Sequence, residues 1–125
     1  MPNYTDAAAT LPASDFDRAK AFYEGVLGFE VEESNPGGVF YRSGGAQLFV
    51  YPSGYAGTNQ ATAATLLVDD VESAVAELRE KGVTFEEYDF PGLKTVDGIA
   101  DLEGEKSAWF KDTEGNILSV AQRTS

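Results

Sequence analysis

Apolar residues recur every three or four positions in two stretches of the chain, which is the spacing of an amphipathic helix. The first stretch runs from Ser14 to Gly28 (SDFDRAKAFYEGVLG), and the second begins at Asp69 (DDVESAVAELREKG) and ends at Gly82. Serine and aspartate favour the start of a helix, and glycine favours its end because it adopts a left-handed backbone without strain. We therefore predict two helices, the first capped by Ser14 and the second by the aspartates at 69 and 70.

A run of small and β-branched residues precedes each helix, AAATLPA before the first and ATAATLLV before the second, and both runs suit a short strand. The starts of the two helices correspond at an offset of 55 residues, which pairs Asp15 with Asp70. Self-similarity of this kind indicates a duplicated supersecondary unit.

The segment 39–51 (VFYRSGGAQLFVY) aligns without a gap on 108–120 (AWFKDTEGNILSV), at an offset of 69 residues. The alignment pairs Tyr41 with Phe110 and Leu48 with Ile117. Each half then contains a strand, a helix and about three further strands, and the second half carries 14 extra residues before its hairpin. We predict an α+β fold with two βαβββ modules, at about 4–55 and 60–123, in a single domain of residues 1–125.

The composition, with 42% hydrophobic and 12% aromatic residues in 125, suffices for one packed core. Acidic residues outnumber basic ones 21 to 9, and the net charge of −12 disfavours nucleic acid and anionic membranes as partners. This acidity serves either solubility or a cationic ligand. Because the chain has no cysteine, no signal-peptide pattern and no apolar run of membrane-spanning length, we expect it in the cytoplasm.

The chain contains neither histidine nor cysteine, so a thiol nucleophile, an imidazole base and the soft metal ligands are excluded. The segment DTEGN lacks the alternating acids and closing glutamate of a calcium loop, and we interpret it as a turn. Strand alternation would place Glu86 and Tyr88 on one face and Glu87 and Asp89 on the other. A carboxylate with a raised pKa could act there as a base, and a solvated edge strand is the alternative.

Two segments, LPASDFDRAKAFYEGVLGFEV and AWFKDTEGNILSVAQ, resemble the paired signatures of the glyoxalase / bleomycin-resistance / extradiol-dioxygenase superfamily, also called vicinal oxygen chelate proteins. The resemblance spans residues 5–122 in order. It implies two βαβββ modules whose curved mixed sheets surround a shared cavity, commonly in a homodimer.

Metal-dependent members of this family bind a divalent ion through His, Glu or Gln on the strand before each helix and on the last strand of each module. In this chain the matching positions carry Ala8, Ala63, Ser119 and either Phe49 or Val50. None of these side chains is a metal ligand of the family, so we expect no metal ion and no cofactor. Gln47 is the nearby amide, and the sequence alone leaves open which face of its strand it occupies.

The resemblance and the absent ligands predict a metal-free protein that binds a small organic molecule in the sheet cavity, to sequester or to deliver it. The alternative is a lyase, isomerase or dioxygenase-like enzyme with an atypical site, and no catalytic residue is assigned. Small residues on the cavity strands leave volume for a ligand, and aromatic residues beside them supply apolar contacts. The candidate ligand-binding residues are Thr10, Gln47, Phe49, Tyr51, Tyr88, Trp109 and Ser119.

The 14 extra residues of the second half fall in YDFPGLKTVDGIADLEGEK, which we interpret as a long loop. Its glycines supply hinges and its apolar residues suit a lid over the cavity, whereas a surface loop packed by its own side chains is the alternative. The lid candidates are Phe90 and Leu93 as apolar contacts, and Lys94 and Asp97 as polar contacts.

Overall fold

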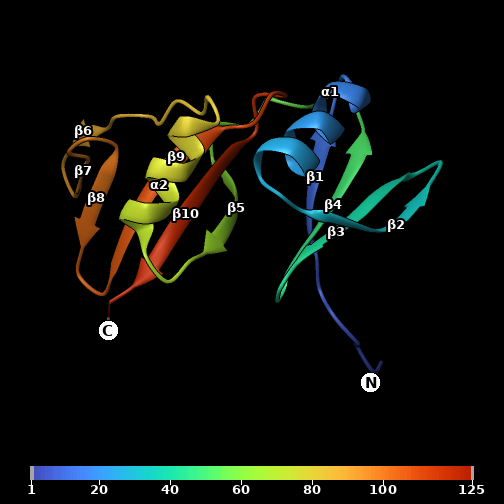
Figure 1. Ribbon diagram of the computed structural model, residues 1–125, viewed down its shortest axis with the longest axis horizontal. Coiled ribbons are helices and arrows are strands. Elements are labelled where there is room, and N and C mark those ends of the chain that lie inside the picture. The colour runs from blue at the N-terminus through green and yellow to red at the C-terminus, as the bar shows by residue number, and fades with distance from the viewer. Residues whose placement is uncertain (1, 125) are drawn as a thin grey trace.

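The computed structural model describes residues 2–124 and contains two similar modules that lie side by side (Figure 1). The first module comprises β1 (Ala9–Ala13), α1 (Phe16–Ala21), the π-helical turn η1 (Phe22–Val26), β2 (Glu30–Asn35), β3 (Gly38–Ser43) and β4 (Ala46–Pro52). The second module comprises β5 (Thr62–Leu67), α2 (Val71–Glu80), β6 (Asp89–Phe90), β7 (Leu93–Lys94), β8 (Ile99–Leu102), β9 (Glu105–Lys111) and β10 (Ile117–Arg123).

Each module builds a four-stranded mixed sheet, with the strand order β1-β4-β3-β2 in the first and β5-β10-β9-β8 in the second. The first strand of each module pairs in parallel with the last, and the remaining pairs are antiparallel. The two hairpins, β3–β4 and β9–β10, occupy equivalent places in the two sheets. The predicted α+β fold of two βαβββ modules is therefore confirmed.

The helices end where the glycines predict, because Gly28 and Gly82 have φ values of 76° and 95°, which glycine adopts without strain. Asp70 caps α2 as predicted, since its carboxylate accepts a hydrogen bond from the Ser73 amide at 3.2 Å. The predicted cap of the first helix was wrong by one residue. Asp15 accepts from the Arg18 amide at 3.1 Å, because its neighbour Ser14 turns toward the second module.

The pairing of the strands corrects the ungapped alignment of the hairpins. Tyr41 lies opposite Leu48 in the first hairpin, and Phe110 lies opposite Leu118 in the second. Leu48 therefore corresponds to Leu118, and the predicted pairing with Ile117 was wrong by one residue. The physical reason is that the chain from Phe110 to its partner Leu118 is one residue longer than the chain from Tyr41 to its partner Leu48.

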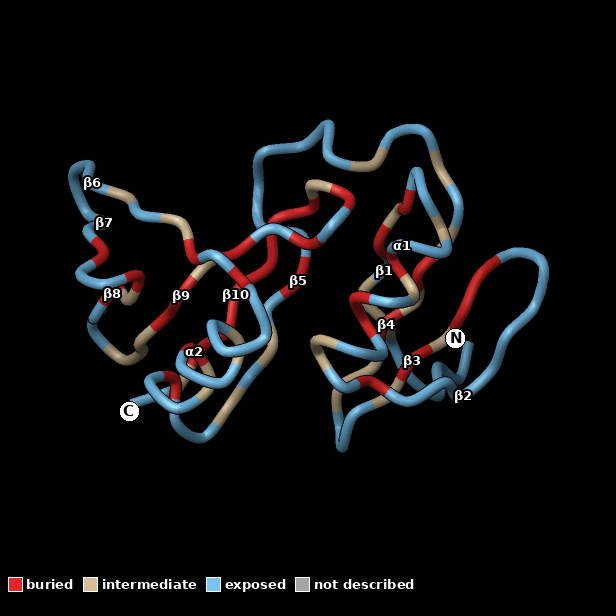
Figure 2. The backbone as a smooth tube through the Cα atoms, turned by 45° about the horizontal axis from the view of Figure 1, so that its top comes forward, coloured by how far each residue is buried: buried red, intermediate tan, exposed pale blue. Residues whose placement is uncertain are grey.

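A single hydrophobic core joins the helices to one face of both sheets. Figure 2 shows buried residues alternating with more exposed ones along β1 and β4, whereas β2 is exposed throughout and residues 117–121 of β10 are all buried. Leu48 and Val50 of β4 and Leu118 and Val120 of β10 point into this core, and each is at most 3% exposed. We call the opposite side of each sheet its far face.

The turn between β9 and β10 holds the two modules together. The Glu114 side chain is completely buried, and its two carboxylate oxygens accept five hydrogen bonds. Arg18 of α1 donates two of them, at 2.8 and 3.1 Å, and the Asp15 amide donates another at 2.8 Å. Burial alone would raise the pKa of Glu114, but these donors hold it at about 2.

Two further polar residues of the same turn face the first module. Asp112 accepts hydrogen bonds from the Tyr23 hydroxyl at 2.6 Å and from the amides of Glu114 and Asn116. The Asn116 side chain donates to the carbonyl oxygen of Pro12 at 2.8 Å. The segment DTEGN is thus a turn, as predicted, and it also ties β10 to α1 and β1.

Candidate functional site

The far face of the first sheet carries a row of three aromatic rings. The rings of Phe40 and Phe49 lie 4.4 Å apart, and those of Phe49 and Tyr51 lie 6.1 Å apart and are almost parallel. A Cβ atom at Gly38 would come within 2.8 Å of the Phe49 ring, so this glycine allows the ring to lie against β3. All three rings are partly exposed, and they offer a continuous aromatic surface.

Gln47 lies on this same far face, because it alternates with the core residues Leu48 and Val50. The strand pairing thus shows which face of β4 Gln47 occupies, a question that the sequence left open. The side-chain oxygen of Gln47 is buried without a hydrogen-bond donor among the described residues. Thr10 pairs in register with Phe49, so the candidates Thr10, Gln47, Phe49 and Tyr51 are all brought to one surface.

The far face of the second sheet combines small residues with an aromatic cluster. Ser119 is buried and donates a hydrogen bond to the Thr65 hydroxyl at 2.9 Å. Trp109 pairs in register with Ser119, and the Tyr88 ring meets the Trp109 ring edge-on at 5.5 Å. Burial, and then the nearby carboxylate of Glu86, raises the pKa of Tyr88. The structure thus brings Tyr88, Trp109 and Ser119 together on the second far face.

The positions that match the metal ligands of the family lie on the far faces. With the corrected register, Phe49 corresponds to Ser119. Phe49 pairs with Thr10 of β1 and Ser119 pairs with Thr65 of β5, and Ala8 and Ala63 lie two residues before these threonines. Three of the four side chains are hydrocarbon, and the serine hydroxyl already bonds to Thr65. Such a set does not fit a divalent cation. Among residues 2–124, no three His, Cys, Asp or Glu side chains form a cluster suited to a metal ion.

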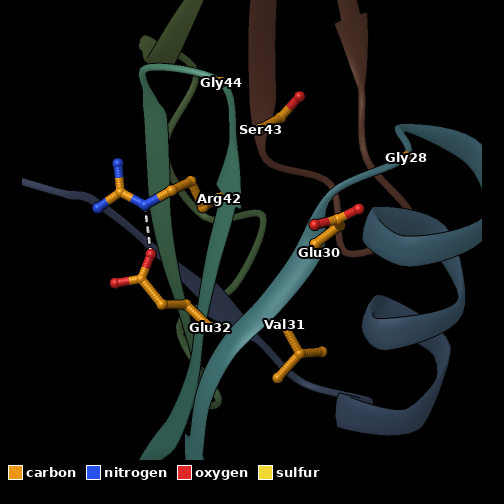
Figure 3. A pocket seen from close by; sticks show the side chains of 7 residues that line it. All are labelled: Gly28, Glu30, Val31, Glu32, Arg42, Ser43 and Gly44. Carbon is orange, nitrogen blue, oxygen red and sulfur yellow. Dashed lines mark hydrogen bonds and ion pairs between the residues drawn. The ribbon is translucent and has the colours of Figure 1, made fainter.

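A polar pocket of about 370 Å³ opens at the outer edge of the first module, between β2 and the β3–β4 turn. Figure 3 shows Arg42 and Glu32 meeting on one side of these strands, and Glu30 and Ser43 pointing to the other. Arg42 also pairs with Asp6 at 3.5 Å. Because its cation is already paired with two carboxylates, we do not place the main ligand site here.

The segment between α2 and β9 is more regular than the predicted long loop. It contains the short hairpin β6–β7 and the strand β8, which pairs with β9. The Phe90 ring contacts Tyr88 at 5.9 Å, beside Trp109, and Leu93 and Lys94 lie on the facing strand of the hairpin. Asp97 instead pairs with Arg79 of α2 at 3.3 Å, so the structure does not bring it to the aromatic cluster.

Glu86 and Tyr88 lie on one side of the 86–89 segment, as predicted, and Glu87 on another. Glu86 and Tyr88 line a pocket of about 290 Å³ together with Lys111, whose ammonium nitrogen lies 3.9 Å from the Glu86 carboxylate. Glu87 points away from this pocket and accepts hydrogen bonds from the Thr95 hydroxyl and the Gly98 amide. Glu87 therefore anchors the segment, while Glu86 remains at the pocket.

Comparison with known proteins gives a family and a fold. A model of the Glyoxalase/Bleomycin resistance protein/Dioxygenase superfamily matches residues 6–120. No curated protein matches the sequence significantly. In the described part of the chain, no helix is long and apolar enough to cross a membrane.

Many solved structures share the fold at low sequence identity. UcmS2 is 20% identical with a TM-score of 0.72, over 94% of this chain and 98% of that one. TnmS3, an antibiotic binding protein from Streptomyces sp. CB03234, is 22% identical with a TM-score of 0.66, over 98% and 100%. The lactoylglutathione lyase from Agrobacterium tumefaciens is 22% identical with a TM-score of 0.68, over 97% and 95%.

Proposed function

Because the chain belongs to the Glyoxalase/Bleomycin resistance protein/Dioxygenase superfamily, we propose that it binds a small organic molecule against the far faces of its sheets, without a metal ion. The observation that carries this proposal is the row of Phe40, Phe49 and Tyr51, with the unpartnered oxygen of Gln47 beside it. Apolar surface with a few polar groups is typical of ligand sites. The similar Streptomyces structure is named an antibiotic binding protein, which supports sequestration as the role.

The ligand that this surface favours is aromatic and carries a hydrogen-bond donor. Rings stack on Phe49 and Tyr51, and a hydroxyl or N–H group would donate to the Gln47 oxygen, whose burial without a donor costs about 1–3 kcal/mol. The net charge of −12 favours a neutral or cationic molecule over an anion. We propose the cytoplasm as its place of action, because a chain without cysteine needs no oxidising compartment.

A thermal-shift screen of aromatic natural products, cationic drugs and metabolites tests this function. A ligand at 100 times its dissociation constant stabilises the protein by about 2.7 kcal/mol. We expect Phe49→Ala and Gln47→Ala to abolish or weaken the stabilisation, and Val31→Ala, at an exposed position of β2, to preserve it. Stabilisation that survives Phe49→Ala unchanged would place the site elsewhere.

Elemental analysis of protein purified without chelators tests the metal-free part of the proposal. We expect no stoichiometric Zn, Ni, Mn or Fe, because the matched positions carry Ala8, Phe49, Ala63 and Ser119. One metal ion per chain would contradict the proposal and favour the alternative, a lyase, isomerase or dioxygenase-like enzyme. The pair of Glu86 and Lys111 beside Tyr88 is where such an enzyme would hold an acid and a base.

We also propose that two copies of the chain complete the site as a homodimer. The aromatic row is left partly exposed by its own chain, and a second copy would cover it. Sedimentation at tens of micromolar tests this, and a species near 13.4 kDa alone would contradict it.

The β6–β7 hairpin is the proposed lid. Phe90 is 53% exposed and touches Tyr88, which in turn touches Trp109, so closure of the hairpin over a ligand that reaches the far face of the second sheet would change the surroundings of the indole. We expect a ligand bound at this face to shift Trp109 fluorescence and to slow proteolysis between Phe90 and Gly104. If both stay unchanged on binding, the hairpin is a surface loop.

A further inference from the structure

A second, apolar crevice lies between the two modules, and its core-side part is on the helix side of the sheets, away from the aromatic row. It exists because β1 begins at Ala9, opposite Leu48, whereas β4 begins two residues earlier at Ala46. Before Ala9, the first residue of β1, no strand within residues 2–124 lies between Ala46 and the end of β5. The edge of one sheet therefore faces the edge of the other across open space.

Both modules contribute walls to this crevice. Its core-side part has a volume of about 200 Å³, and an outer part of about 400 Å³ shares the lining residues Ser43, Ala46, Leu66 and Leu67 with it. The first module contributes Leu27 and Phe29, and α2 contributes Ala74, Glu77 and Leu78. Leu67 is 55% exposed at the rim and extends the apolar lining to the surface.

The charge of the crevice is of one sign. Glu77 is the charged side chain among the residues that line it, and no lysine or arginine of residues 2–124 lines either part. The remaining polar side chains are the hydroxyls of Ser43 and Thr65. A chain with a net charge of −12 adds a negative field to this local charge.

From this arrangement we propose that the crevice binds compact hydrophobic amines, with the apolar body between Leu27, Leu66 and Leu78 and the protonated nitrogen at the Glu77 carboxylate. A carboxylate of the same shape would be repelled by Glu77, and a neutral alcohol would lose the ion pair. The site is separate from the row of Phe40, Phe49 and Tyr51 on the far face of the first sheet. Because both modules line the crevice, a bound amine would stabilise the contact between the modules.

Three probes of one shape test the proposal: cyclohexylmethylamine, cyclohexylmethanol and cyclohexanecarboxylate, titrated into the full chain at pH 7 and followed by amide chemical shifts. We expect the amine to bind most tightly and the carboxylate least, with the shift changes centred on Leu66, Leu67, Ala74 and Leu78. Equal affinity for amine and carboxylate, or shift changes centred on Phe49 and Tyr51, would overturn the proposal.

Substitutions on α2 separate the effect of the Glu77 charge on binding from effects on the fold or on net charge. Glu77→Gln should weaken amine binding about three- to fivefold, the factor that an exposed ion pair supplies, and leave alcohol binding unchanged. Glu80→Gln, on the same helix but outside the crevice, is the matched control and should change neither. If both variants weaken the amine equally, the effect is one of net charge and the proposed site is wrong.

A variant of the other site makes the two proposals distinguishable. Phe49→Ala should leave the affinity for cyclohexylmethylamine unchanged, because Phe49 lies on the far face of the first sheet. Leu67→Ser should weaken it, since Leu67 forms the rim, while leaving ligands of the aromatic row unaffected. Loss of amine binding in Phe49→Ala would overturn the separate site without contradicting binding at the aromatic row.

Discussion

The turns of the two equivalent hairpins have diverged completely in what they contact. A Cβ atom at Gly44 or Gly45, in the β3–β4 turn, would meet no atom within 4 Å, and both glycines are exposed. In the β9–β10 turn, Asp112, Glu114 and Asn116 are each 6% exposed and bond to the first module. Equivalent hairpins of a duplicated fold therefore need not make equivalent contacts: the polar side chains of the second turn join the modules.

Among substitutions in the two turns, Glu114→Ala should lower the free energy of unfolding the most. It leaves the Asp15 amide and the Ser14 and Thr113 hydroxyls without their acceptor, and we expect a loss of about 2–4 kcal/mol in the free energy of unfolding. Urea unfolding measures it. A loss below about 0.5 kcal/mol, the usual size for a surface position, would show that the turn does not join the modules energetically.

Acid should weaken the same contact. The folded-state pKa of Glu114 is about 2, below its ordinary value of 4.5, so its contribution is complete above about pH 5 and is lost as the pH falls from 4.5 toward 2. We expect about 2 kcal/mol from this group, because half-exposure of Arg18 weakens the ion pair. Urea unfolding of wild type and Glu114→Gln at pH 6 and pH 3 should show the difference between the proteins shrinking at pH 3. A constant difference would contradict the assigned pKa.

Asn116→Ala should have a smaller effect, about 1–2 kcal/mol. It removes the donor to the Pro12 carbonyl oxygen and one of the donors to Asp112, while Tyr23 continues to donate to that carboxylate. Denaturant unfolding measures the change. An Asn116→Asp variant gives a sharper comparison, because a carboxylate in its place would face Asp112 and should cost more than alanine.

Gly45→Ala, in the turn of the first hairpin, should have the smallest effect. Its added methyl group meets open space and its φ is not in the left-handed region, so we expect a change within about 0.5 kcal/mol by the same unfolding experiment. Gly44 is unsuitable as this control, since its φ is 57°. A large loss in Gly45→Ala would mean that the first turn also contacts other parts of the protein.

The far faces of the two sheets differ as much as the turns do. The first presents Phe40, Phe49 and Tyr51 in one row, and the second buries Ser119 against Thr65, with Trp109 beside it on β9. Strand alternation in the sequence predicted that some aromatics would face away from the core. Which ones did so depended on the register, and Phe49 could be separated from Val50 only by the pairing of β4 with β3 and β1.

Local chemistry along the chain was sufficient to determine the two helices, their glycine ends and the strand that precedes each of them. These features depend on side-chain spacing and on backbone preferences of single residues, which neighbours in sequence decide. The repeat then fixed that Tyr41 and Phe110 occupy equivalent places. The family resemblance depended on these same local signals, which is why it could be stated before the fold was seen.

Only the tertiary structure decided the burial of Glu114 and the choice of Asp15 over Ser14 as the helix cap. A glutamate in a polar turn is exposed in most proteins, and nothing near it in sequence indicates otherwise. Four of its five hydrogen bonds come from residues that lie 96 to 100 positions away in the sequence, so their effect arises only when the two modules meet. The same holds for the crevice beside Leu67, whose walls come from strands of different sheets and whose shape depends on where β1 begins.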